Sequence, residues 1–583
     1  MILDENNRII KAESTNTYRR KIMKKFLIVV LAAIVATVSL FGCADDNMPE
    51  PAKQAEVKSE LASTFIQTSG SPGSPSVVTE IASRSAFDAL DVNGVRPASV
   101  IVRAGADGNA KAVNGETLGT LAEAYDKFGG KIIPIFRAET DEEADALIKF
   151  YKEKYRVVDS AVLSSTPGLV KRVKGENSEI RGIIGFAATE TPENIVKTLA
   201  ENCAITALLS ENASVDTIRY IQARFMTAWV RSGADVFSVA KTAANGAYGV
   251  VTDDYATAYD AFKTFGKYDV LRTAYNVAHR GLPKTHNENS VSGISAAIAA
   301  GATHVELDCY LTTDGEVVLM HDSDISRTTD GAGNIESMTL AELRTNKLDV
   351  FGEEDVPTLS EAIDAFAGSD AIMVLELKSS KPELAEKIKA VVEAKDFYEN
   401  FVVISFSADN IAKAREVMPR VPAALLVSSV REDKYATTIT AATALGAALD
   451  ADLGSATLTF NRTLCDRGIA GWYWTYDDAL GVKYGRIEGY TGLTNNDATA
   501  FTDWYKTLEI ADVSLPGIEK GDEITAVATT YAGEKKEVAA TVIEVVGNGG
   551  TYEVIVAASD MQINKRDARA IACGSVKKLP VVE

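Results

Sequence analysis

All four histidines of the chain lie within one stretch of 43 residues, at His279, His286, His304 and His321. Imidazole titrates near neutral pH, so it can take up or release a proton during catalysis. The 278 residues that precede this stretch contain no histidine. Acid–base chemistry that uses histidine is therefore expected only in the second half of the chain.

Carboxylates with the spacing of a metal site lie in and near the same stretch. Glu306 and Asp308 are two residues apart on a predicted strand, HVELDCYL, so their side chains point the same way. Two such groups repel each other unless a cation joins them. Glu376, at the end of the next predicted strand, offers a third oxygen ligand. An all-oxygen set suits Mg²⁺ or Ca²⁺. A buried, salt-bridged pair is the alternative interpretation of Glu306 and Asp308.

The elements that must position these residues alternate between short apolar runs and amphipathic stretches. The apolar runs are Tyr275–Ala278, His304–Leu311, Ala371–Leu377, Phe401–Phe406, Ala423–Val427, Ala447–Leu449, Ile469–Thr475 and Gly489–Thr494. Eight β-then-α units in about 240 residues are typical of a TIM (β/α)8 barrel, whose active site lies at the C-terminal ends of the strands. A doubly wound α/β sheet is the alternative, but the glycine-rich phosphate loop usual in that fold is missing.

Residues 76–268 show the same rhythm. Their strand-like runs are Ala98–Arg103, Lys131–Phe136, Ser160–Ser164, Ile180–Phe186, Ala204–Leu209, Met226–Val230 and Gly249–Thr252. The segment TLAEA at 120–124 resembles TLSEA at 358–362, and the last strand also repeats. We therefore expect two related barrels in tandem, 76–268 and 269–507, with chance similarity of two α/β segments as the alternative.

The first of these barrels is expected to be catalytically inactive. It lacks histidine, and its early strand SVIVRA carries no E-x-D pair. The place aligned with Glu376 falls in the run KIIPIFR, near the apolar Ile135. Residues 508–583 differ from both barrels, because alternating runs and a Gly-rich turn predict a small antiparallel β domain.

The N-terminal residues have the pattern of an export signal. Lys24 and Lys25 precede an apolar stretch, 26–40, which is shorter than the about 20 residues of a membrane-spanning helix. It ends in LFGC, which resembles the lipobox of bacterial lipoproteins and implies a lipidated Cys43. Residues 1–43 are thus predicted to be a leader and lipoprotein signal, with Met23 a better start than Met1. An ordinary signal peptide or an anchor helix is the alternative.

Residues 44–75, rich in Ala, Ser, Pro and Gly, are predicted to be a flexible tether.

The overall composition excludes several classes of protein. Of 583 residues, 46% are hydrophobic and 24% charged, which is normal for globular domains. The net charge of −21, without a dense basic block in the folded part, argues against a nucleic-acid partner. The five cysteines are far apart and form no C-x-x-C pair, so a disulfide framework or zinc ribbon is not expected. The sequence does not indicate an oligomeric state.

The histidine window and the 200 residues around it resemble the glycerophosphodiester phosphodiesterases, a family of metal-dependent TIM-barrel enzymes. The matching motifs, in the family's order, are His279-Arg280-Gly281, Glu288-Asn289, Glu306-Leu307-Asp308, Asp314-Gly315, His321-Asp322, Arg327-Thr328-Thr329, Pro357-Thr358-Leu359, Glu376-Leu377-Lys378 and Trp474-Thr475. Two positions depart from the pattern, because Asn287 stands where the family often has Pro and Ser290 where Thr is common. Neither change removes a reactive group.

The resemblance implies a role for each of these side chains. His279 and His321 would be the acid–base pair, with the two roles unassigned between them. Arg280 and Lys378 would bind the phosphate, while Glu306, Asp308 and Glu376 would bind the metal. Trp474 would line the alcohol side of the pocket, or be an ordinary core tryptophan. Three further residues, Glu288, Asn289 and Asp322, are expected to surround the site. Glu288 would orient a histidine or the ligand, or would cap a helix. His286 and His304 match no motif and are expected in surface or packing roles.

Hydrolysis of glycerophosphodiesters to sn-glycerol 3-phosphate and an alcohol is the function that the resemblance implies. Phospholipase D-like cleavage of a lipid headgroup through a cyclic phosphate is an alternative, because related barrels share these motifs. A surface lipoprotein that binds phosphodiesters without cleaving them is another. Cys43 would hold the protein at a membrane of the bacterial cell envelope, on its periplasmic or extracellular face. The barrel of residues 76–268 would then be a degenerate copy of the catalytic domain.

Overall fold

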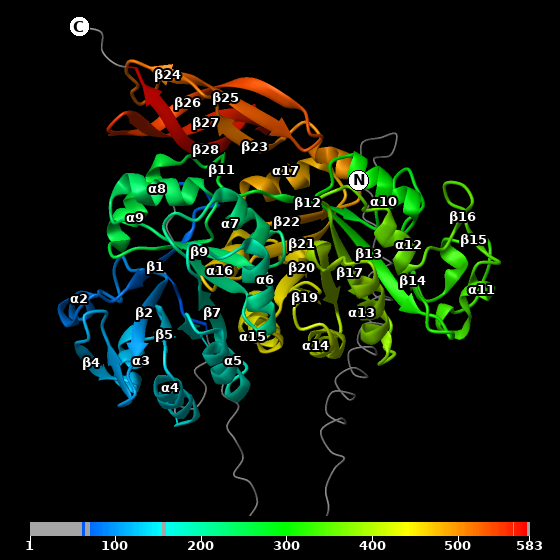
Figure 1. The fold of residues 1–583 in the computed structure, drawn as a ribbon, viewed down its shortest axis with the longest axis horizontal. Coiled ribbons are helices and arrows are strands. Elements are labelled where there is room, and N and C mark those ends of the chain that lie inside the picture. The colour runs from blue at the N-terminus through cyan, green and yellow to red at the C-terminus, as the bar shows by residue number, and fades with distance from the viewer. Residues whose placement is uncertain (1–60, 65–69, 154–158, 564, 580–583) are drawn as a thin grey trace, which may run out of the picture. The chain divides into compact units, whose positions relative to one another are not determined.

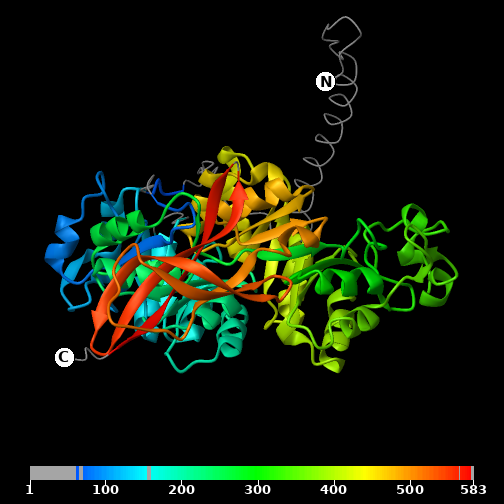
Figure 2. The ribbon, with the colours of Figure 1, turned by 90° about the horizontal axis from the view of Figure 1, so that it is seen from above.

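The computed structural model describes residues 61–64, 70–153, 159–563 and 565–579. The expected signal segment and Cys43 lie outside these ranges. Within the described ranges, no helix combines the length and the apolar character needed to cross a membrane. Two closed α/β barrels and a third, mostly antiparallel sheet make up the described chain (Figure 1, Figure 2).

The first barrel has eight parallel strands, each paired with its neighbour in the sequence. They are β1 (Ser76–Glu80), β2 (Ser99–Ala104), β5 (Ile133–Arg137), β6 (Ala161–Ser164), β7 (Arg181–Gly185), β8 (Thr206–Leu209), β9 (Thr227–Arg231) and β10 (Gly249–Val251). Strand β1 pairs with both β2 and β10 and so closes the barrel. The sequence had indicated seven of these strands and missed β1, a short run directly after the Ser/Pro-rich segment. Two short strands, β3 (Asn109–Lys111) and β4 (Thr117–Thr120), extend β2 in antiparallel fashion.

The helices of the first barrel alternate with its strands. They are α2 (Arg84–Ala89), α3 (Leu121–Phe128), α4 (Asp141–Glu153), α5 (Pro167–Glu176), α6 (Pro192–Glu201), α7 (Val215–Gln222), α8 (Val236–Ala244) and α9 (Tyr255–Ala261). This alternation of strand and helix around a closed parallel sheet is the TIM-barrel architecture.

The second barrel contains all eight strands that the sequence predicts. They are β12 (Tyr275–His279), β13 (His304–Leu311), β17 (Ile372–Leu377), β18 (Phe401–Ser405), β19 (Ala423–Val427), β20 (Ala448–Asp452), β21 (Gly471–Tyr476) and β22 (Gly492–Asn495). Strand β12 pairs with β13 and β22 and closes this barrel too. An antiparallel strand, β14 (Val317–Leu319), extends β13, as β3 extends β2.

The helices of the second barrel follow the same order. They are α10 (Val291–Ala299), α11 (Leu340–Leu343), α12 (Leu359–Asp364), α13 (Leu384–Ala394), α14 (Ala408–Val417), α15 (Tyr435–Leu445), α16 (Leu458–Cys465) and α17 (Ala479–Ile487). A small hairpin, β15 (Lys347–Leu348) with β16 (Glu354–Asp355), lies between β14 and α12. The predicted TIM barrel is therefore confirmed.

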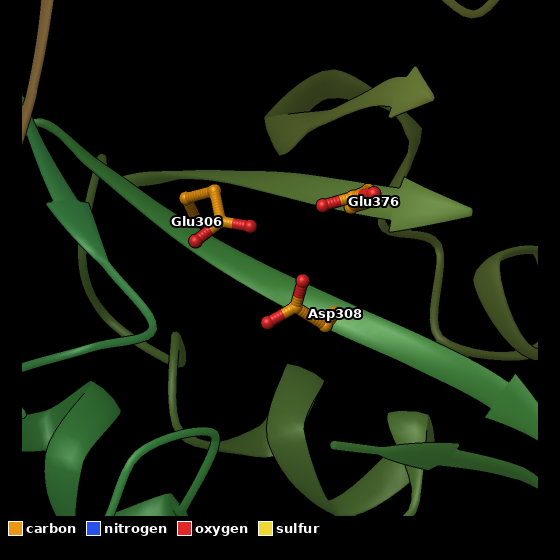
Figure 3. A group of neighbouring side chains, drawn as sticks. All are labelled: Glu306, Asp308 and Glu376. Atoms are coloured by element: carbon orange, nitrogen blue, oxygen red, sulfur yellow. The ribbon is translucent and has the colours of Figure 1, made fainter. Parts of the chain in front are cut away.

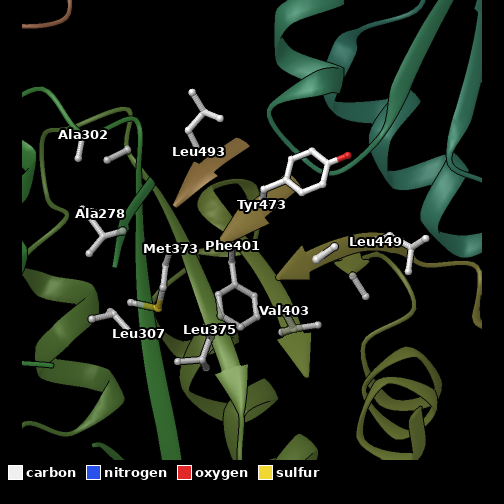
Figure 4. Close-up of a cluster of buried hydrophobic side chains, with 14 of the residues drawn as sticks. Ala278, Ala302, Leu307, Met373, Leu375, Phe401, Val403, Leu449, Tyr473 and Leu493 are labelled. Carbon is white, nitrogen blue, oxygen red and sulfur yellow. The ribbon is translucent and has the colours of Figure 1, made fainter. Parts of the chain in front are cut away.

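Alternation along the strands of the second barrel decides which side chains face the helices and which face the interior. Leu307, Met373 and Leu375 belong to the apolar layer under the surrounding helices (Figure 4). Their neighbours Ile372 and Val374 belong to the interior cluster instead. Because side chains alternate along a strand, Glu306, Asp308 and Glu376 share the inward side with Val374. This alternation aims the three carboxylates at the mouth of the barrel.

The internal repeat is visible as matching local structure in the two barrels. Thr120 caps α3 and Thr358 caps α12, and each forms a reciprocal capping box with the Glu three residues later. In the last strand of each barrel, a glycine lies against a tryptophan of the preceding strand. A Cβ on Gly249 would lie 2.6 Å from Trp229, and one on Gly492 would lie 1.8 Å from Trp472. Both positions therefore require glycine, which explains why the two segments resemble each other.

The third sheet is formed by the C-terminal residues and a strand between the barrels. Its strands are β11 (Asp269–Val270), β23 (Tyr505–Ile510), β24 (Ser514–Leu515), β25 (Glu523–Thr530), β26 (Lys535–Asn548), β27 (Thr551–Ile563) and β28 (Arg566–Lys578). Strand β27 contacts both barrels, since Asp560 pairs with Arg486 of α17 at 2.5 Å and Glu553 pairs with Lys241 of α8 at 3.0 Å. The antiparallel β domain expected at the C-terminus is present.

The two barrels contact each other through the N-terminal ends of their strands. His304, the first residue of β13, donates from Nε2 to the carbonyl oxygen of Ala223 at 2.8 Å. Thr206, the first residue of β8, donates to the carbonyl oxygen of Gly468 at 3.0 Å. The ring of Trp472 lies 4.4 Å from that of Phe225. This contact leaves the C-terminal ends of both sets of strands free of the other barrel.

Residues 70–75, at the end of the expected tether, pack against the barrels. Ser71 and Ser74 are buried, and the Ser71 hydroxyl donates to the carbonyl oxygen of Asp269 at 2.6 Å. Ala62 is also buried, and its amide donates to Asp159 at 2.6 Å. These residues belong to the folded body and differ in this from the flexible spacer predicted for 44–75.

Asp159 joins the barrels through a buried ion pair, and its removal is expected to lower stability. Arg467 of the second barrel approaches Asp159 to 2.5 Å and Arg181 of the first to 2.9 Å, and all three side chains are buried. Asp159→Asn leaves two buried guanidinium groups without a counter-charge, so we expect the free energy of unfolding to fall by about 3–5 kcal/mol in urea denaturation.

The matched control is Asp141→Asn, which removes an exposed pair with Arg172. That change is expected to cost less than about 1 kcal/mol. Equal losses for the two variants would contradict a buried, interface-forming role for Asp159.

Candidate active site

Three buried carboxylates meet at the C-terminal mouth of the second barrel. Glu306 and Asp308 lie on β13, and Glu376 lies directly opposite Asp308 on the neighbouring strand β17. One oxygen from each of the three lies within 4.8 Å of the others (Figure 3). Parallel pairing places the two strand ends side by side, so the geometry follows from the register of β13 and β17.

The electrostatics of this group show a deficit of positive charge. Burial, together with the neighbouring Asp308, raises the pKa of Glu306 well above its usual value and that of Glu376 to about 7. Burial opposes the ionisation of Asp308 as well, but Lys378 and nearby cations outweigh it and hold its pKa below the usual value. Lys378 Nζ lies 3.2 Å from Asp308 and 3.1 Å from Glu376.

A divalent cation fits this group. Asp308 Oδ1 is buried, and its one partner in the described part of the chain is the ammonium group of Lys378 at 3.2 Å, a contact without hydrogen-bond geometry. The donors are three carboxylates, the oxygen ligands that Mg²⁺ and Ca²⁺ prefer. A cation there would favour the ionised form of Glu306 and Glu376, which burial and mutual repulsion now disfavour. These three carboxylates are the group of potential metal ligands found among the described residues.

The turn after β12 supports the carboxylates from one side. The amide of Arg280, at a φ of 56°, donates to Glu306 Oε2 at 3.0 Å. Gly281 follows at a φ of 88°, and a Cβ there would lie 2.8 Å from the backbone of Gly293. Asn289 forms two hydrogen bonds with Asp308. Its Nδ2 donates to the carboxylate and its Oδ1 accepts from the Asp308 amide, both at 2.9 Å.

His279, at the end of β12, is oriented by an amide chain. Asn496 donates from Nδ2 to Asp477 at 2.6 Å, which leaves its Oδ1 to accept from His279 Nδ1 at 2.7 Å. The proton on Nδ1 leaves His279 Nε2 as a free acceptor, 3.9 Å from Glu306 Oε2. Burial, together with the charge on Arg280, lowers the pKa of His279 to about 4, so the ring is neutral.

His321 is held differently, by a carboxylate. Its Nδ1 donates to Asp322 Oδ1 at 2.6 Å, and Asp322 is itself paired with Arg327. Arg327 also forks onto Glu288, at 3.0 and 2.5 Å. Glu288 further pairs with Arg280 at 3.3 Å, so it links two arginines and touches no histidine. Ser290, not Glu288, caps the following helix α10.

Comparison with known proteins places the second barrel in a family. Residues 279–500 match the model of the glycerophosphoryl diester phosphodiesterase family. A glycerophosphodiester phosphodiesterase of Bacillus altitudinis is 32% identical over 175 residues, which are 28% of this chain and 71% of that protein. The chain belongs to the glycerophosphoryl diester phosphodiesterase family. The match begins at His279 and covers every predicted site residue of the second barrel.

The chain spans less than two thirds of the length of two further curated relatives of this phosphodiesterase family member. The glycerophosphodiester phosphodiesterase of Caldanaerobacter subterraneus subsp. tengcongensis is 33% identical over 160 residues, 26% of this chain and 65% of that protein. Human glycerophosphodiester phosphodiesterase 1 is 35% identical over 148 residues, 24% of this chain and 45% of that protein. The structure of an Oleispira antarctica phosphodiesterase in complex with sn-glycerol-3-phosphate aligns with a TM-score of 0.36 and 24% identity, over 39% of this chain and 94% of that one.

The family barrel encloses a cavity of about 130 Å³ between the carboxylates and an aromatic wall. His279, His321 and Lys378 line it on the polar side. Trp474 and Phe406 line the other side, with their rings edge to face at 5.6 Å. Trp474 is only partly buried and donates from Nε1 to the carbonyl oxygen of Asp450 at 3.2 Å. Its place is therefore the cavity wall and not the closed core.

The structure brings nearly all predicted site residues of the phosphodiesterase barrel to one place, and it adds several. His279, Arg280, Glu306, His321, Glu376, Lys378 and Trp474 line one cavity, while Glu288, Asn289, Asp308 and Asp322 contact members of that set. The sequence interpretation missed Asn496, Asp477, Phe406 and the buried Asp450. Asn496 directly follows the last barrel strand, a position that could have signalled it.

Asp450 reaches the same cavity from β20. Burial, together with Glu376, raises the pKa of Asp450 to about 8. Two histidines lie apart from the cavity: His304 is buried at the other end of β13, and His286 contacts Thr285 on the surface side.

The first barrel corrects one prediction about the missing site. Val78 of β1 pairs with Ser99 of β2, and Val277 of β12 pairs with His304 of β13, so Ser99 is the counterpart of His304. Four residues further along the two strands, Arg103 is therefore the counterpart of Asp308. Arg137 pairs with Arg103 as Glu376 pairs with Asp308. The counterpart of Glu376 is therefore Arg137, not the apolar Ile135 expected from the sequence. Sequence comparison missed it because a shift of two residues along a strand leaves the apolar pattern unchanged.

Asn289 is expected to control metal affinity through its two bonds to Asp308. Asn289→Gly removes both bonds yet tolerates the φ of 55° at this position. Loss of a residue that orients a ligand typically weakens metal binding by about 10–100-fold. Titration calorimetry with Mg²⁺ and Ca²⁺ measures this change.

The exposed Asn334, whose side chain caps a distant turn of the same barrel, provides the control. Asn334→Gly should leave the metal affinity unchanged. An Asn289→Gly protein that binds metal as tightly as the wild type would show that Asp308 does not depend on this contact.

Proposed function

We propose that the second barrel hydrolyses glycerophosphodiesters to sn-glycerol 3-phosphate and an alcohol. The observation that carries this proposal is the buried trio of Glu306, Asp308 and Glu376 beside two differently oriented histidines. Binding a phosphodiester needs positive charge alone, whereas cleaving it also needs groups that move protons. Both kinds of group line the same cavity. Membership of the phosphodiesterase family supports the same reaction.

We assign the two proton-transfer roles from the hydrogen bonds of the histidines. Asn496 fixes the proton of His279 on Nδ1, so its Nε2 can take a proton from the attacking hydroxyl. Asp322 accepts from Nδ1 of His321, which leaves Nε2 as the ring atom that would protonate the leaving alkoxide. The oxygen–phosphorus bond to the nucleophile forms while the bond to the alcohol breaks. His279 then holds the proton of the nucleophile and His321 has given one to the alcohol, and proton exchange with solvent restores both histidines.

The remaining cavity residues bind charge and shape. Glu306, Asp308 and Glu376 would hold Mg²⁺ or Ca²⁺, and such an ion, when bound, offsets the charge of the phosphodiester oxygens. Arg280 and Lys378 would bind the same phosphate, Arg280 with its planar guanidinium fork. Trp474 and Phe406 would contact the apolar part of the alcohol. A neighbouring cavity of about 330 Å³, lined by His279, Lys284 and Asn496, is open to the polar side of the substrate.

The nucleophile decides which of two related outcomes occurs. Water as nucleophile gives sn-glycerol 3-phosphate directly. A neighbouring hydroxyl of the substrate gives a cyclic phosphate, the product of a phospholipase D-like route. Both nucleophiles use the same pair of histidines, so only the product separates them.

Hydrolysis of glycerophosphocholine and glycerophosphoethanolamine, followed by phosphorus NMR, tests the proposal. The wild-type protein is expected to turn over both compounds with added Mg²⁺ or Ca²⁺ and to lose activity with chelator. His279→Ala and His321→Ala should each lower kcat by about 10²–10⁴-fold, the usual contribution of a positioned acid or base. A phosphomonoester signal indicates water as nucleophile, and a cyclic phosphate indicates the alternative.

His286→Ala is the matched control, because His286 lies on the surface side of the same window. Its activity should equal that of the wild type. Chelator-resistant activity would refute the metal site, and full activity of His279→Ala would refute the acid–base assignment. Binding of these compounds without turnover would favour a non-catalytic binding protein.

We further propose that Cys43 anchors the protein by a covalent lipid in the bacterial cell envelope. Support comes from the basic residues, the apolar stretch and the LFGC motif, all in residues outside the described ranges. The acidic chain would be repelled by anionic lipid, so the acyl chains must hold it.

Expression in a bacterial host with labelled palmitate tests the anchor. The wild-type chain should carry the label and sediment with membranes, while Cys43→Ala should carry none and be released into the soluble fraction. Cys203→Ala, which changes a cysteine of the first barrel, should behave like the wild type. An unlabelled wild-type chain would contradict lipidation.

A further inference from the structure

The first barrel has a cavity of its own at the C-terminal ends of its strands. It encloses about 340 Å³, and its lining includes Glu80, Arg103, Lys111, Arg137 and Glu139. The second barrel covers only the opposite ends of these strands, so it does not close this mouth. The cavity thus occupies, in the first barrel, the place that the active site occupies in the second.

The charges at this mouth are exchanged relative to the active site. Strand register gives the correspondence: Arg103 replaces Asp308, Arg137 replaces Glu376 and Ile101 replaces Glu306. The same register puts Glu80 where His279 stands, and Arg231 where Trp474 stands. Where the second barrel has carboxylates that would hold a metal ion, the first barrel has arginines.

The carboxylates at the mouth of the first barrel form ion pairs with its arginines and accept hydrogen bonds from nearby backbone amides. Glu80 pairs with Arg137 at 2.6 Å and with Arg231 at 2.9 Å. Glu143 accepts from Arg103 at 2.8 Å and from the Glu139 amide at 2.7 Å. Glu139 accepts from the hydroxyl of Ser164 and the amide of Ser165, at 3.2 and 2.9 Å. The carboxylates therefore fix the arginines in place and are themselves satisfied.

The arginines keep donors that their carboxylate partners do not use. Arg103 turns its Nε and Nη2 to Glu143, and Arg231 turns its Nη1 to Glu80, out of the five N–H groups that each guanidinium has. Arg137 Nε is buried and makes no hydrogen bond among the described residues, although Glu139 Oε1 lies 3.6 Å from it. Lys111 adds a fourth cation, only weakly paired with Asp107 at 3.5 Å. Arg103, Lys111 and Arg137 line the cavity from three strands, β2, β3 and β5, while Arg231 of β9 reaches it only through its pair with Glu80.

We propose that this cavity binds a phosphoryl group, as free phosphate or as a phosphate monoester, without a metal ion and without cleaving it. Guanidinium forks match the geometry of phosphate oxygens, and donors from several strands suit a tetrahedral dianion better than a planar carboxylate. The first barrel offers no histidine, and within the described residues it holds no carboxylate trio for a metal. The ligand is therefore retained and not turned over.

Titration calorimetry on the full chain, in the presence of chelator, tests this site separately from the active site. Inorganic phosphate and glycerol 3-phosphate are the two probes, and they distinguish a site for the free ion from a site for its ester. We expect one binding event that survives chelator and also survives His279→Ala. Arg103→Gln and Lys111→Gln, both at partly exposed side chains that line the cavity, should each weaken it by about tenfold or more.

Arg84→Gln serves as the control, since Arg84 lies on α2 of the same barrel and pairs only with exposed groups. It should bind the probes as the wild type does, and thermal unfolding of each variant verifies that the barrel is intact. Absence of binding in chelator would overturn the proposal, as would unchanged affinity in both Arg103→Gln and Lys111→Gln. Equal binding of acetate would overturn the assignment to a phosphoryl group.

Discussion

The register of the parallel strands around each closed barrel is the constraint on which the rest of the structure depends. In the second barrel, pairing of Asp308 with Glu376 brings together carboxylates that are far apart in the chain. In the first barrel the equivalent pairing joins Arg103 and Arg137. Because side chains alternate along every strand, a register fixed by the apolar core also fixes which charged groups reach the mouth. One architecture therefore carries a group of carboxylates at one mouth and paired arginines at the corresponding positions of the other.

The charge of the second site follows from this enforced proximity. Burial and mutual repulsion raise the pKa of Glu306 and Glu376 although Lys378 and Arg280 lie beside the three carboxylates. A further cation at this place would therefore be favourable. Asn289 and the turn at Arg280 resist the repulsion by hydrogen bonding to Asp308 and Glu306. The two histidines beside this centre differ in their hydrogen-bond partners. The Nδ1 of His279 bonds to the side-chain amide of Asn496, and the Nδ1 of His321 bonds to the carboxylate of Asp322.

The contact between the barrels shows what the first barrel contributes to the folded chain. It covers the N-terminal ends of the catalytic strands, where Trp472 and His304 would otherwise face water. Asp159 and the third sheet, through Asp560, add buried ion pairs that cross between parts of the chain. Such pairs penalise separation strongly, because each leaves an uncompensated charge. Stability and catalysis thus use opposite ends of the same barrel.

The sequence by itself determined the two barrels, the β domain and most of the active-site residues, because strand periodicity and ordered motifs are local properties of the chain. It did not reveal β1, the packing of residues 70–75, or the role of Asn496, since each depends on partners hundreds of residues away. It also misaligned Ile135 with Glu376, because an apolar pattern repeats every two residues and does not specify register. Only the tertiary structure decided that register, through hydrogen bonds between strands, and with it the position of every charge at the two mouths.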